Sequence, residues 1–303
     1  MKRVIMTGGT GFIGSWLVKE LISRGIEVTI LTSNPKKVKT RHPLIKIVYT
    51  DYDNLEIIHE KVEGGFDAFY HLGWAGVAAK DKNDISLQLT NIDYSIKAIK
   101  LSVSLNCKVF IAAGTVAEYV FSEKVIDFTL KQTPNDIYGA TKVALHYLLE
   151  AVAKQIRQNM IWVVLPSTFG EGRKEDNIIS YTITSLLRRE RPCYGNLEQM
   201  WDFLYVTEVT RALAEIGEKG KYNVTYGIGS GHYRPLRVYI QTIRDMIDPE
   251  LPLGIGEVQS QSKQTLSSCV NIEELTADTG FRPRITFEDG MKKTIQYYRE
   301  QME

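Results

Sequence analysis

The sequence predicts an α/β fold built on a doubly wound parallel sheet, with a smaller lobe toward the C-terminus. Short apolar runs with strand character alternate with longer segments of helical spacing from the N-terminus to Leu165. After Pro166 the pattern loosens into a polar, glycine-rich stretch that ends near Gly195, and mixed elements follow. Such alternation is typical of parallel sheets, because a helix must carry the chain back to the start of the next strand.

Each element has its own local signal. The runs that we expect to be strands are Val4–Met6, Val28–Leu31, Ile45–Tyr49, Ala68–His71, Val109–Ala112 and Ile161–Leu165. The expected helices are Ile13–Arg24, Leu87–Leu105 and Asp136–Arg157. The first helix repeats apolar residues at helical spacing, and Gly25 provides its stop signal. A short apolar passage, Phe203–Val206, follows the polar stretch.

The glycine-rich string TGGTGFIG, Thr7–Gly14, joins the first strand to the first helix. Gly8 permits a tight turn, Gly11 lets backbone N–H groups approach a pyrophosphate, and Gly14 lets the helix pack closely on the strand. A lone string of this kind can also be a packing turn, but its place in a strand–helix–strand unit favours a dinucleotide site. We therefore expect a Rossmann-type dinucleotide-binding domain over residues 1–166, with 202–229 returning to it, and a smaller substrate-binding lobe formed by 167–201 and 230–303.

Composition narrows the class of protein. The 303 residues carry a net charge of +1, which gives no reason to expect nucleic acid or an anionic membrane as a partner. The three cysteines are far apart and match neither a disulfide framework nor a metal site, so we expect no metal. The N-terminus runs directly into the first strand, and no uncharged apolar stretch is long enough for a membrane span. We expect a cytoplasmic protein.

Tyr138 and Lys142 lie four residues apart in IYGATK, a spacing that puts both side chains on one face of a helix. A protonated lysine beside a tyrosine favours the phenolate, so we expect Lys142 to lower the pKa of Tyr138 and to make it a better acid or base. Thr115 follows the strand Val109–Ala112 and is a further hydroxyl candidate. Alone, a Tyr–Lys pair at this spacing is common on solvated helices.

TGGTGFIG, HLGWAG after the fourth strand, Thr115 and YGATK occur in this order, and DFLYVTEVTRAL and TGFRP follow toward the C-terminus. As a set they make the chain resemble the extended short-chain dehydrogenase/reductase family of NAD(P)-dependent nucleotide-sugar epimerases, dehydratases and ketoreductases. The resemblance implies that Tyr138 is the general acid or base and that Lys142 holds the nicotinamide ribose. It also implies that Thr115 hydrogen-bonds the substrate oxygen that takes part in hydride transfer.

The same resemblance implies further binding residues. Cofactor contacts are expected from Gly8, Gly11, Phe12, Ile13, Gly14, Asp51, Tyr52, Leu72, Gly73, Trp74, Tyr138, Lys142 and Pro166. Substrate contacts are expected from Trp74, Thr115, Thr168, Arg173, Asn177 and Lys263. The family often has an asparagine where Thr168 stands, and related chains tend to use an arginine where this chain offers Lys263. A lysine neutralises a phosphate but lacks the two-pronged geometry of arginine.

The second strand ends in LTSNPKK, Leu31–Lys37, without the acidic residue that an NAD-preferring unit places there for the ribose 2′-hydroxyl. A 2′-phosphate would instead meet hydroxyls, a helix start and two lysines, supplied by Thr32, Ser33, Asn34, Lys36 and Lys37. The sequence thus favours NADP(H), with NAD(H) as the alternative. The missing carboxylate is stronger evidence than the two lysines, which could equally be a solvated helix start.

The residues after Thr115 bear on the reaction. In the dehydratase branch an aspartate and a glutamate follow the catalytic threonine, whereas Val116 and Ala117 follow it here and cannot move a proton. This disfavours dehydration. The strings AGTVAEY and HLGWAG are similar to those of reductases that act on 4-keto-6-deoxy sugars, and with the NADP(H) preference this resemblance implies NADPH-dependent reduction of the 4-keto group of a nucleotide-activated 4-keto-6-deoxyhexose in deoxysugar biosynthesis. The alternative is a nucleotide-sugar epimerase with bound NAD, and a non-catalytic dinucleotide-sensing protein is disfavoured because Thr115, Tyr138 and Lys142 are all retained. We expect a homodimer through the helices Leu87–Leu105 and Asp136–Arg157.

Overall fold

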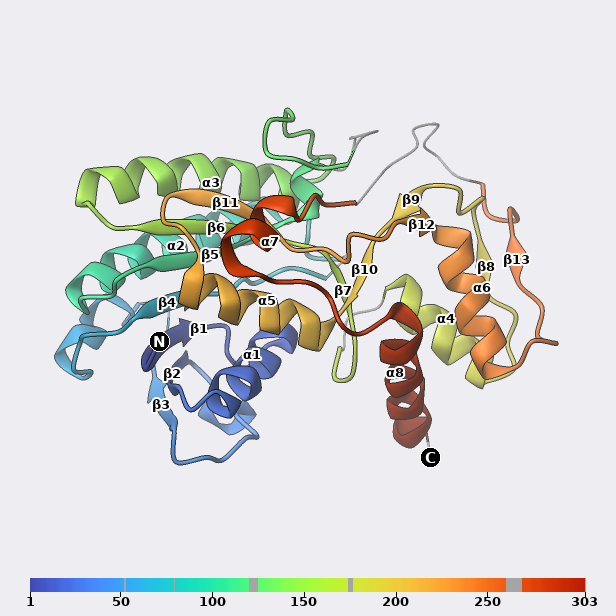
Figure 1. Ribbon diagram of the computed structural model, residues 1–303, viewed down its shortest axis with the longest axis horizontal. Coiled ribbons are helices and arrows are strands. Elements are labelled where there is room, and N and C mark those ends of the chain that lie inside the picture. Colours follow the sequence, from blue (N-terminus) through green and yellow to red (C-terminus); the bar gives the residue numbers. More distant parts are fainter. Residues whose placement is uncertain (52, 79, 120–124, 174–176, 260–268, 303) are drawn as a thin grey trace.

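The computed structural model describes residues 1–51, 53–78, 80–119, 125–173, 177–259 and 269–302 (Figure 1). Its centre is a seven-stranded sheet in the order β11-β6-β5-β4-β1-β2-β3, and every neighbouring pair of strands is parallel. The strands are β1 (Arg3–Thr7), β2 (Glu27–Thr32), β3 (Ile45–Tyr49), β4 (Ala68–His71), β5 (Phe110–Thr115), β6 (Met160–Leu165) and β11 (Val224–Gly227). The predicted doubly wound parallel sheet is confirmed.

Helices cover both faces of this sheet. α1 (Phe12–Ser23) and α5 (Val206–Lys219) share one buried apolar cluster with the sheet, and α2 (Ile85–Ser104) and α3 (Ile137–Ile156) share a second cluster with it. Figure 1 shows the two pairs of helices on opposite sides of the strands. The chain order reverses between β1 and β4, and open α/β sheets bind ligands at such a switch point, outside the carboxyl ends of the strands.

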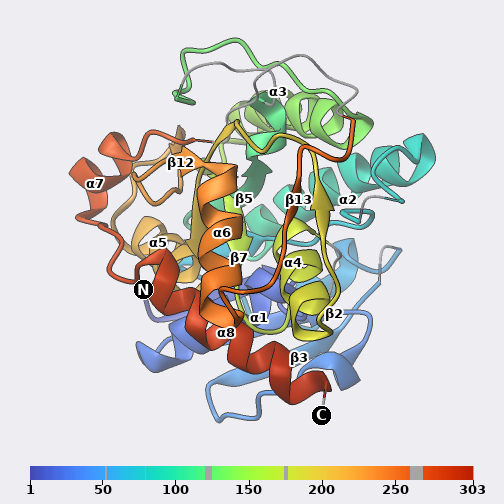
Figure 2. The same ribbon diagram turned by 90° about the vertical axis from the view of Figure 1, so that its right-hand side faces the viewer.

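A smaller lobe packs beside the carboxyl edge of the sheet, and Figure 2 looks onto it. Its two-stranded pairs are β7 (Ser167–Phe169) with β10 (Phe203–Tyr205), β8 (Cys193–Tyr194) with β13 (Gly254–Ile255), and β9 (Met200–Trp201) with β12 (Arg234–Pro235). Its helices are α4 (Ile178–Leu187), α6 (Leu236–Ile247) and α8 (Phe287–Met302), while α7 (Glu273–Thr279) contacts α5 and β11. Phe169, Phe203, Tyr239 and Phe287 are at the centre of its apolar core. The division into two domains at the predicted residues stays a prediction.

One predicted element is too short. The strand expected at Val109–Ala112 continues as β5 to Thr115, because Gly114 and Thr115 pair in register with Val164 and Leu165 of β6. Glycine is depleted in strands, so Gly114 masked this continuation in the sequence. As a result Thr115 is the last residue of a central strand, not part of a loop.

No helix among the described residues has both the length and the apolar character that crossing a membrane requires. Over the same residues, no cluster of three or more histidine, cysteine, aspartate or glutamate side chains could hold a metal ion.

Candidate active site

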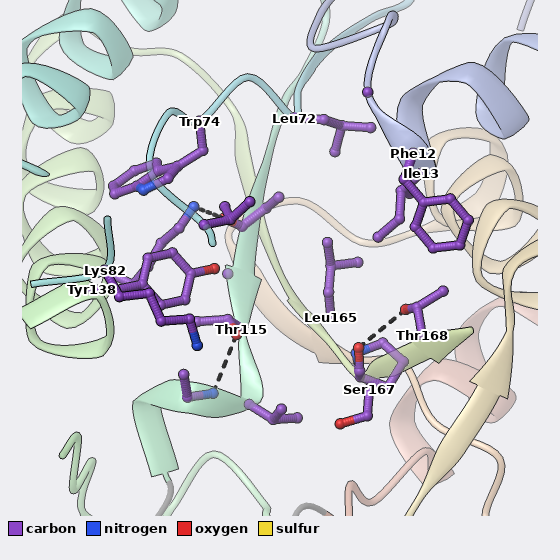
Figure 3. A pocket seen from close by; sticks show the side chains of 18 of the residues that line it. Phe12, Ile13, Leu72, Trp74, Lys82, Thr115, Tyr138, Leu165, Ser167 and Thr168 are labelled. Atoms are coloured by element: carbon purple, nitrogen blue, oxygen red, sulfur yellow. Dashed lines mark hydrogen bonds between the residues drawn. The ribbon is translucent and has the colours of Figure 1, made fainter. Parts of the chain in front are cut away.

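A cavity of about 600 Å³ opens at the carboxyl ends of the central strands, between the sheet and the smaller lobe. The predicted residues that line it are Gly8, Gly11, Phe12, Ile13, Gly14, Leu72, Trp74, Thr115, Tyr138, Lys142, Pro166, Thr168 and Arg173. Figure 3 shows Trp74 and Tyr138 on one side of the cavity, across from Phe12, Ile13 and Thr168 on the other. The structure therefore brings most of the predicted binding residues and all three predicted catalytic residues to one place.

The glycine string forms a cradle at the start of α1. Gly8 has a φ of +75°, and a Cβ there would lie 2.5 Å from the carbonyl carbon of Leu72, while a Cβ on Gly14 would lie 2.1 Å from the carbonyl oxygen of Gly8. These two glycines are thus required by the packing of the chain itself. A Cβ on Gly11 would meet only the Gly8 oxygen, at 3.3 Å. Since Gly11 lines the cavity, the space beside it is available to a ligand.

The first turn of α1 suits an anion. Its N-cap is Gly11, which has no side chain to accept from the free N–H groups, and the turn contains no acidic residue. The uncapped N–H groups and the helix dipole favour negative charge at this point. The open side of Gly11 and this helix start together fit the pyrophosphate of a dinucleotide, with Phe12, Ile13 and Gly14 supplying backbone donors.

Thr115, Tyr138 and Lys142 meet at the other side of the cavity. Thr115 ends β5, and its Oγ1 accepts a hydrogen bond from the Ala117 N–H at 3.2 Å. Tyr138 and Lys142 stand one turn apart on α3, and Figure 3 shows the Tyr138 hydroxyl directed into the cavity. Lys142 Nζ donates to the Ala113 carbonyl at 2.7 Å and lies 3.6 Å from the centroid of the Trp74 ring. The three side chains therefore have a common target in the cavity.

The pKa values of the pair do not follow the sequence-based expectation. Burial raises the pKa of Tyr138 to about 12, and a hydrogen bond with Thr115 acts in the opposite direction. Burial lowers the pKa of Lys142 to about 7, and the Glu118 carboxylate acts against that change. The predicted lowering of the Tyr138 pKa is thus not found, because desolvation dominates for both groups and Lys142 donates its hydrogen bond to Ala113.

The end of β2 carries the predicted 2′-phosphate residues. Thr32 is buried, and its Oγ1 accepts from the Asn34 N–H at 3.1 Å. The expected helix start is a single 3₁₀ turn, η1 (Pro35–Lys37), for which Asn34 is the N-cap but makes no side-chain capping bond. Ser33, Asn34, Lys36 and Lys37 are exposed. The turn offers weaker dipole support than an α-helix, so discrimination for NADP(H) would depend on hydroxyls and lysines.

Three other residues were predicted to contact the cofactor: Asp51, Gly73 and Tyr52. Asp51 is held in its own turn, where Oδ1 accepts from the Asn54 N–H at 3.0 Å and from its side-chain amide at 2.7 Å. The backbone N–H of Gly73 points toward β1, where it donates to Thr7 Oγ1 at 3.3 Å. Tyr52 lies outside the described residues.

The predicted substrate residues also separate. Thr168 and Arg173 line the cavity, and the Arg173 guanidinium donates to the Thr168 carbonyl and lies 5.7 Å from the centroid of the Phe12 ring. Asn177 instead caps α4, where Oδ1 accepts from the N–H groups of Ile179 and Ser180 at 2.9 and 3.2 Å. It is not among the cavity-lining residues, so its predicted contact with the substrate stays a prediction. Lys263 lies outside the described residues.

Some cavity residues were not found from the sequence. Lys82 lies 5.3 Å from the centroid of the Tyr138 ring and 3.8 Å from the Asp136 carboxylate, and Trp201 of β9 forms part of the wall. Lys82 stands in a polar loop that resembles any solvated loop, and Trp201 comes from a distant two-residue strand. The family motifs were the sequence signals that could identify cavity residues, and neither Lys82 nor Trp201 belongs to one of these motifs.

This fold, with its glycine cradle and its Thr–Tyr–Lys group, defines a dehydrogenase/reductase-type enzyme with a dinucleotide cofactor. The model of the family described as "NAD dependent epimerase/dehydratase family" matches residues 4–229. The chain belongs to this family, the extended short-chain dehydrogenase/reductases that modify nucleotide sugars, and it is an NAD(P)-dependent enzyme of that group.

Curated relatives have different activities. The chain is 24% identical to a dTDP-glucose 4,6-dehydratase from Neisseria gonorrhoeae, over 98% of this chain and 95% of that enzyme. It is 23% identical to a dTDP-4-dehydro-6-deoxyglucose reductase from Escherichia coli, over 98% of this chain and 97% of that enzyme. Among solved structures, a UDP-glucose 4-epimerase from Thermotoga maritima with UDP-glucose superposes with a TM-score of 0.83 at 21% identity, covering 99% of this chain and 100% of that one. The structural likeness confirms the fold.

Proposed function

We propose that the protein reduces the 4-keto group of a nucleotide-activated 4-keto-6-deoxyhexose with NADPH. The observation that carries the proposal is the convergence of Thr115, Tyr138 and Lys142 on one cavity beside the glycine cradle. The bound nicotinamide would supply a hydride to the carbonyl carbon. Tyr138 would donate its phenolic proton to the carbonyl oxygen, so that a secondary alcohol and oxidised cofactor result. The tyrosinate would then regain a proton from solvent.

Thr115 suits the role of the group that orients the carbonyl. Its Oγ1 accepts from the Ala117 N–H and its side chain hydrogen-bonds with Tyr138, so the two hydroxyls are adjacent and would both reach one carbonyl oxygen. Lys142 forms part of the cavity wall next to Tyr138 and would hold the ribose hydroxyls of the cofactor. Its ammonium form would also stabilise the tyrosinate that forms as the proton leaves Tyr138.

Two features support this choice within the family. Val116 and Ala117 follow Thr115 and have no acid or base for the elimination that a dehydratase must perform. The end of β2 has no carboxylate to accept from a ribose 2′-hydroxyl, and exposed Lys36 and Lys37 follow it, which supports NADPH. The similarity to the Escherichia coli dTDP-4-dehydro-6-deoxyglucose reductase is consistent with the proposed substrate class.

The test is a panel of nucleotide-linked 4-keto-6-deoxyhexoses, followed by NADPH absorbance and by NMR of the products. We expect one NADPH consumed for each alcohol formed. Interconversion of nucleotide sugars without net NADPH consumption would identify an epimerase instead. No turnover of any member of the panel by a folded, cofactor-binding protein would refute the proposal.

A further inference from the structure

Glu118 has a fully buried side chain directly behind the catalytic threonine, yet the proposed reaction does not use it. It belongs to the 3₁₀ turn η3 (Val116–Tyr119), which follows β5. A buried carboxylate is strongly destabilising unless hydrogen bonds and opposite charge compensate for the lost water. The compensating groups therefore show what this carboxylate is connected to.

The first connection is to the backbone of Thr115. Glu118 Oε1 accepts the Thr115 N–H at 2.8 Å, and Oε2 accepts from Gln132 Nε2 at 3.3 Å. The N–H of Thr133 also donates to the Glu118 carbonyl, at 2.8 Å. The Thr115 backbone is thus held by a charged acceptor while its hydroxyl faces the cavity. Movement of Glu118 would move the end of β5 and with it the Thr115 hydroxyl that orients the carbonyl.

The packing leaves room for this carboxylate only because residue 114 is glycine. A Cβ on Gly114 would lie 2.3 Å from Trp162 Nε1 and 2.7 Å from Glu118 Oε1. His146 of α3 stacks on Trp162 with ring centroids 4.5 Å apart, and its Nδ1 lies 4.0 Å from Glu118 Oε2. Groups from β5, β6 and α3 therefore surround Glu118 and hold it in one place.

The second connection is to Lys142. Its Nζ donates to the Ala113 carbonyl and lies 6.0 Å from the centroid of the Trp162 ring, and a Cβ on the adjacent Gly114 would meet both that ring and Glu118 Oε1. Among the described residues, the titratable groups around Glu118 are Tyr119 on η3 and Tyr138, Lys142 and His146 on α3. Burial lowers the pKa of His146 to about 4, so this ring is neutral near pH 7. Burial raises the pKa of Glu118 to about 7 and Lys142 lowers it, while Glu118 in turn raises the pKa of Lys142. Each group thus favours the charged form of the other.

We propose that Glu118 is a positioning residue whose carboxylate fixes the Thr115 backbone and provides the counter-charge that keeps Lys142 an ammonium. The role in turnover rests on the proposed function, whereas the coupling to Lys142 can be measured without substrate. Below the pKa of Glu118 the carboxylate becomes neutral and holds the Thr115 N–H less strongly, whereas Lys142 is protonated at acidic pH with or without its partner. Turnover should therefore fall as the pH drops through the range near neutrality because the positioning of Thr115 weakens, while the counter-charge matters at and above neutral pH.

Two variants separate the two effects. Glu118→Gln keeps an oxygen for the Thr115 N–H but removes the charge, whereas Glu118→Asp keeps the charge but is one methylene too short for that bond. The matched control is Glu150→Gln, which removes a carboxylate 3.3 Å from His146 Nε2 on the same helix, on a side chain that is 54% exposed. Each variant is checked by circular dichroism and thermal unfolding. Lys142 acetylation is followed by mass spectrometry over a pH series, and turnover is measured over the same series.

For Glu118→Gln we expect the midpoint of Lys142 labelling to fall by about one pH unit, the usual effect of losing a nearby opposite charge. Its kcat should fall roughly 10- to 100-fold with little change in KM, and the acidic limb of the profile should disappear. Glu118→Asp should keep the Lys142 midpoint but lose turnover, and Glu150→Gln should change neither. If the midpoint of Lys142 labelling is unchanged in Glu118→Gln, Glu118 is not the counter-charge of Lys142. If Glu118→Asp keeps the wild-type kcat, Glu118 does not position Thr115.

Two further outcomes are informative. If Glu118→Gln does not fold, Glu118→Asp still decides the positioning. A wild-type turnover that does not decrease toward acidic pH would then count against the role of the Glu118 charge. If the wild type reduces no sugar while Glu118→Gln still shifts the Lys142 midpoint, the proposed function fails and the coupling of Glu118 to Lys142 is supported.

Discussion

Replacing Tyr138 by phenylalanine removes the proposed proton donor and little else. The ring packs edge-on against Trp74 with centroids 6.1 Å apart and an interplanar angle of 79°, and phenylalanine keeps this contact. Loss of a general acid lowers turnover by roughly 100- to 10,000-fold, which corresponds to about 3 to 5 kcal/mol in the activation barrier. We expect a decrease within that range and little change in cofactor affinity, because the glycine cradle and Lys142 remain.

The structure also identifies an alternative proton donor, Lys142. Lys142 lines the same cavity, and burial lowers its pKa to about 7. Any residual turnover of Tyr138→Phe that uses the Lys142 ammonium should therefore be lost as the pH rises through about 7. In contrast, the raised pKa of Tyr138, about 12, keeps the phenol protonated well above neutrality. The wild-type rate should not show an alkaline decrease near pH 7 from this group. Adding Lys142→Met to Tyr138→Phe should remove the residual, pH-dependent turnover.

The assay is single-turnover reduction followed by NADPH absorbance, so that the chemical step is observed directly. Tyr147→Phe is the matched control, since Tyr147 is on the same helix with 61% of its side chain exposed. The control should retain wild-type turnover. If Tyr138→Phe keeps more than about a tenth of wild-type turnover while chemistry limits the rate, the proton comes from another group and the mechanism is wrong.

Three further predictions concern the cofactor and the assembly. Gly11→Ala should lower the melting temperature only slightly, because its φ of −77° suits alanine and a Cβ has one tight contact, with the Gly8 oxygen at 3.3 Å. It should weaken NADPH binding about tenfold or more in calorimetry, and undiminished binding would contradict the cradle. Steady-state kinetics should favour NADPH over NADH, and replacing Lys36 and Lys37 by alanine should reduce that preference; equal efficiency with NADH would refute it. Light scattering should show a homodimer that Leu148→Glu disrupts, since Leu89 and Leu148 on the outer faces of α2 and α3 are 57% and 38% exposed; a wild-type monomer would exclude it.

The sequence predicted the sheet and its helices because both depend on local patterns. Apolar periodicity located β1 to β6, and the glycines of residues 8–14 marked the turn between β1 and α1. The least local element, β11, was expected only as part of a segment that returns to the first domain, since its four residues carry little pattern of their own. The end of β5 was misplaced because glycine is unusual in a strand. At residue 114 it is needed because a Cβ would collide with Trp162 and Glu118.

The candidate site was predictable where a motif combines several residues and unpredictable where it does not. Thr115, Tyr138 and Lys142 stand in motifs whose order carries information, and the structure brings them together. Lys82 and Trp201 reach the cavity from a loop and from a short strand, so only the folded chain shows that they belong to it. Asn177, a predicted substrate ligand, caps the start of α4 through its side-chain oxygen, and its contact with the substrate stays a prediction.

Spacing alone could not give the charge states of the catalytic pair. A tyrosine and a lysine one helical turn apart suggest a phenol made more acidic by an ammonium, and this holds where the lysine remains charged. In this protein both groups are buried, so desolvation raises the pKa of Tyr138 and lowers that of Lys142. A group that favours the charged form of Lys142 therefore also favours its assistance to Tyr138. The carboxylate that opposes the loss of that charge belongs to Glu118, which lies outside the Tyr–Lys motif and is joined to it only by the fold.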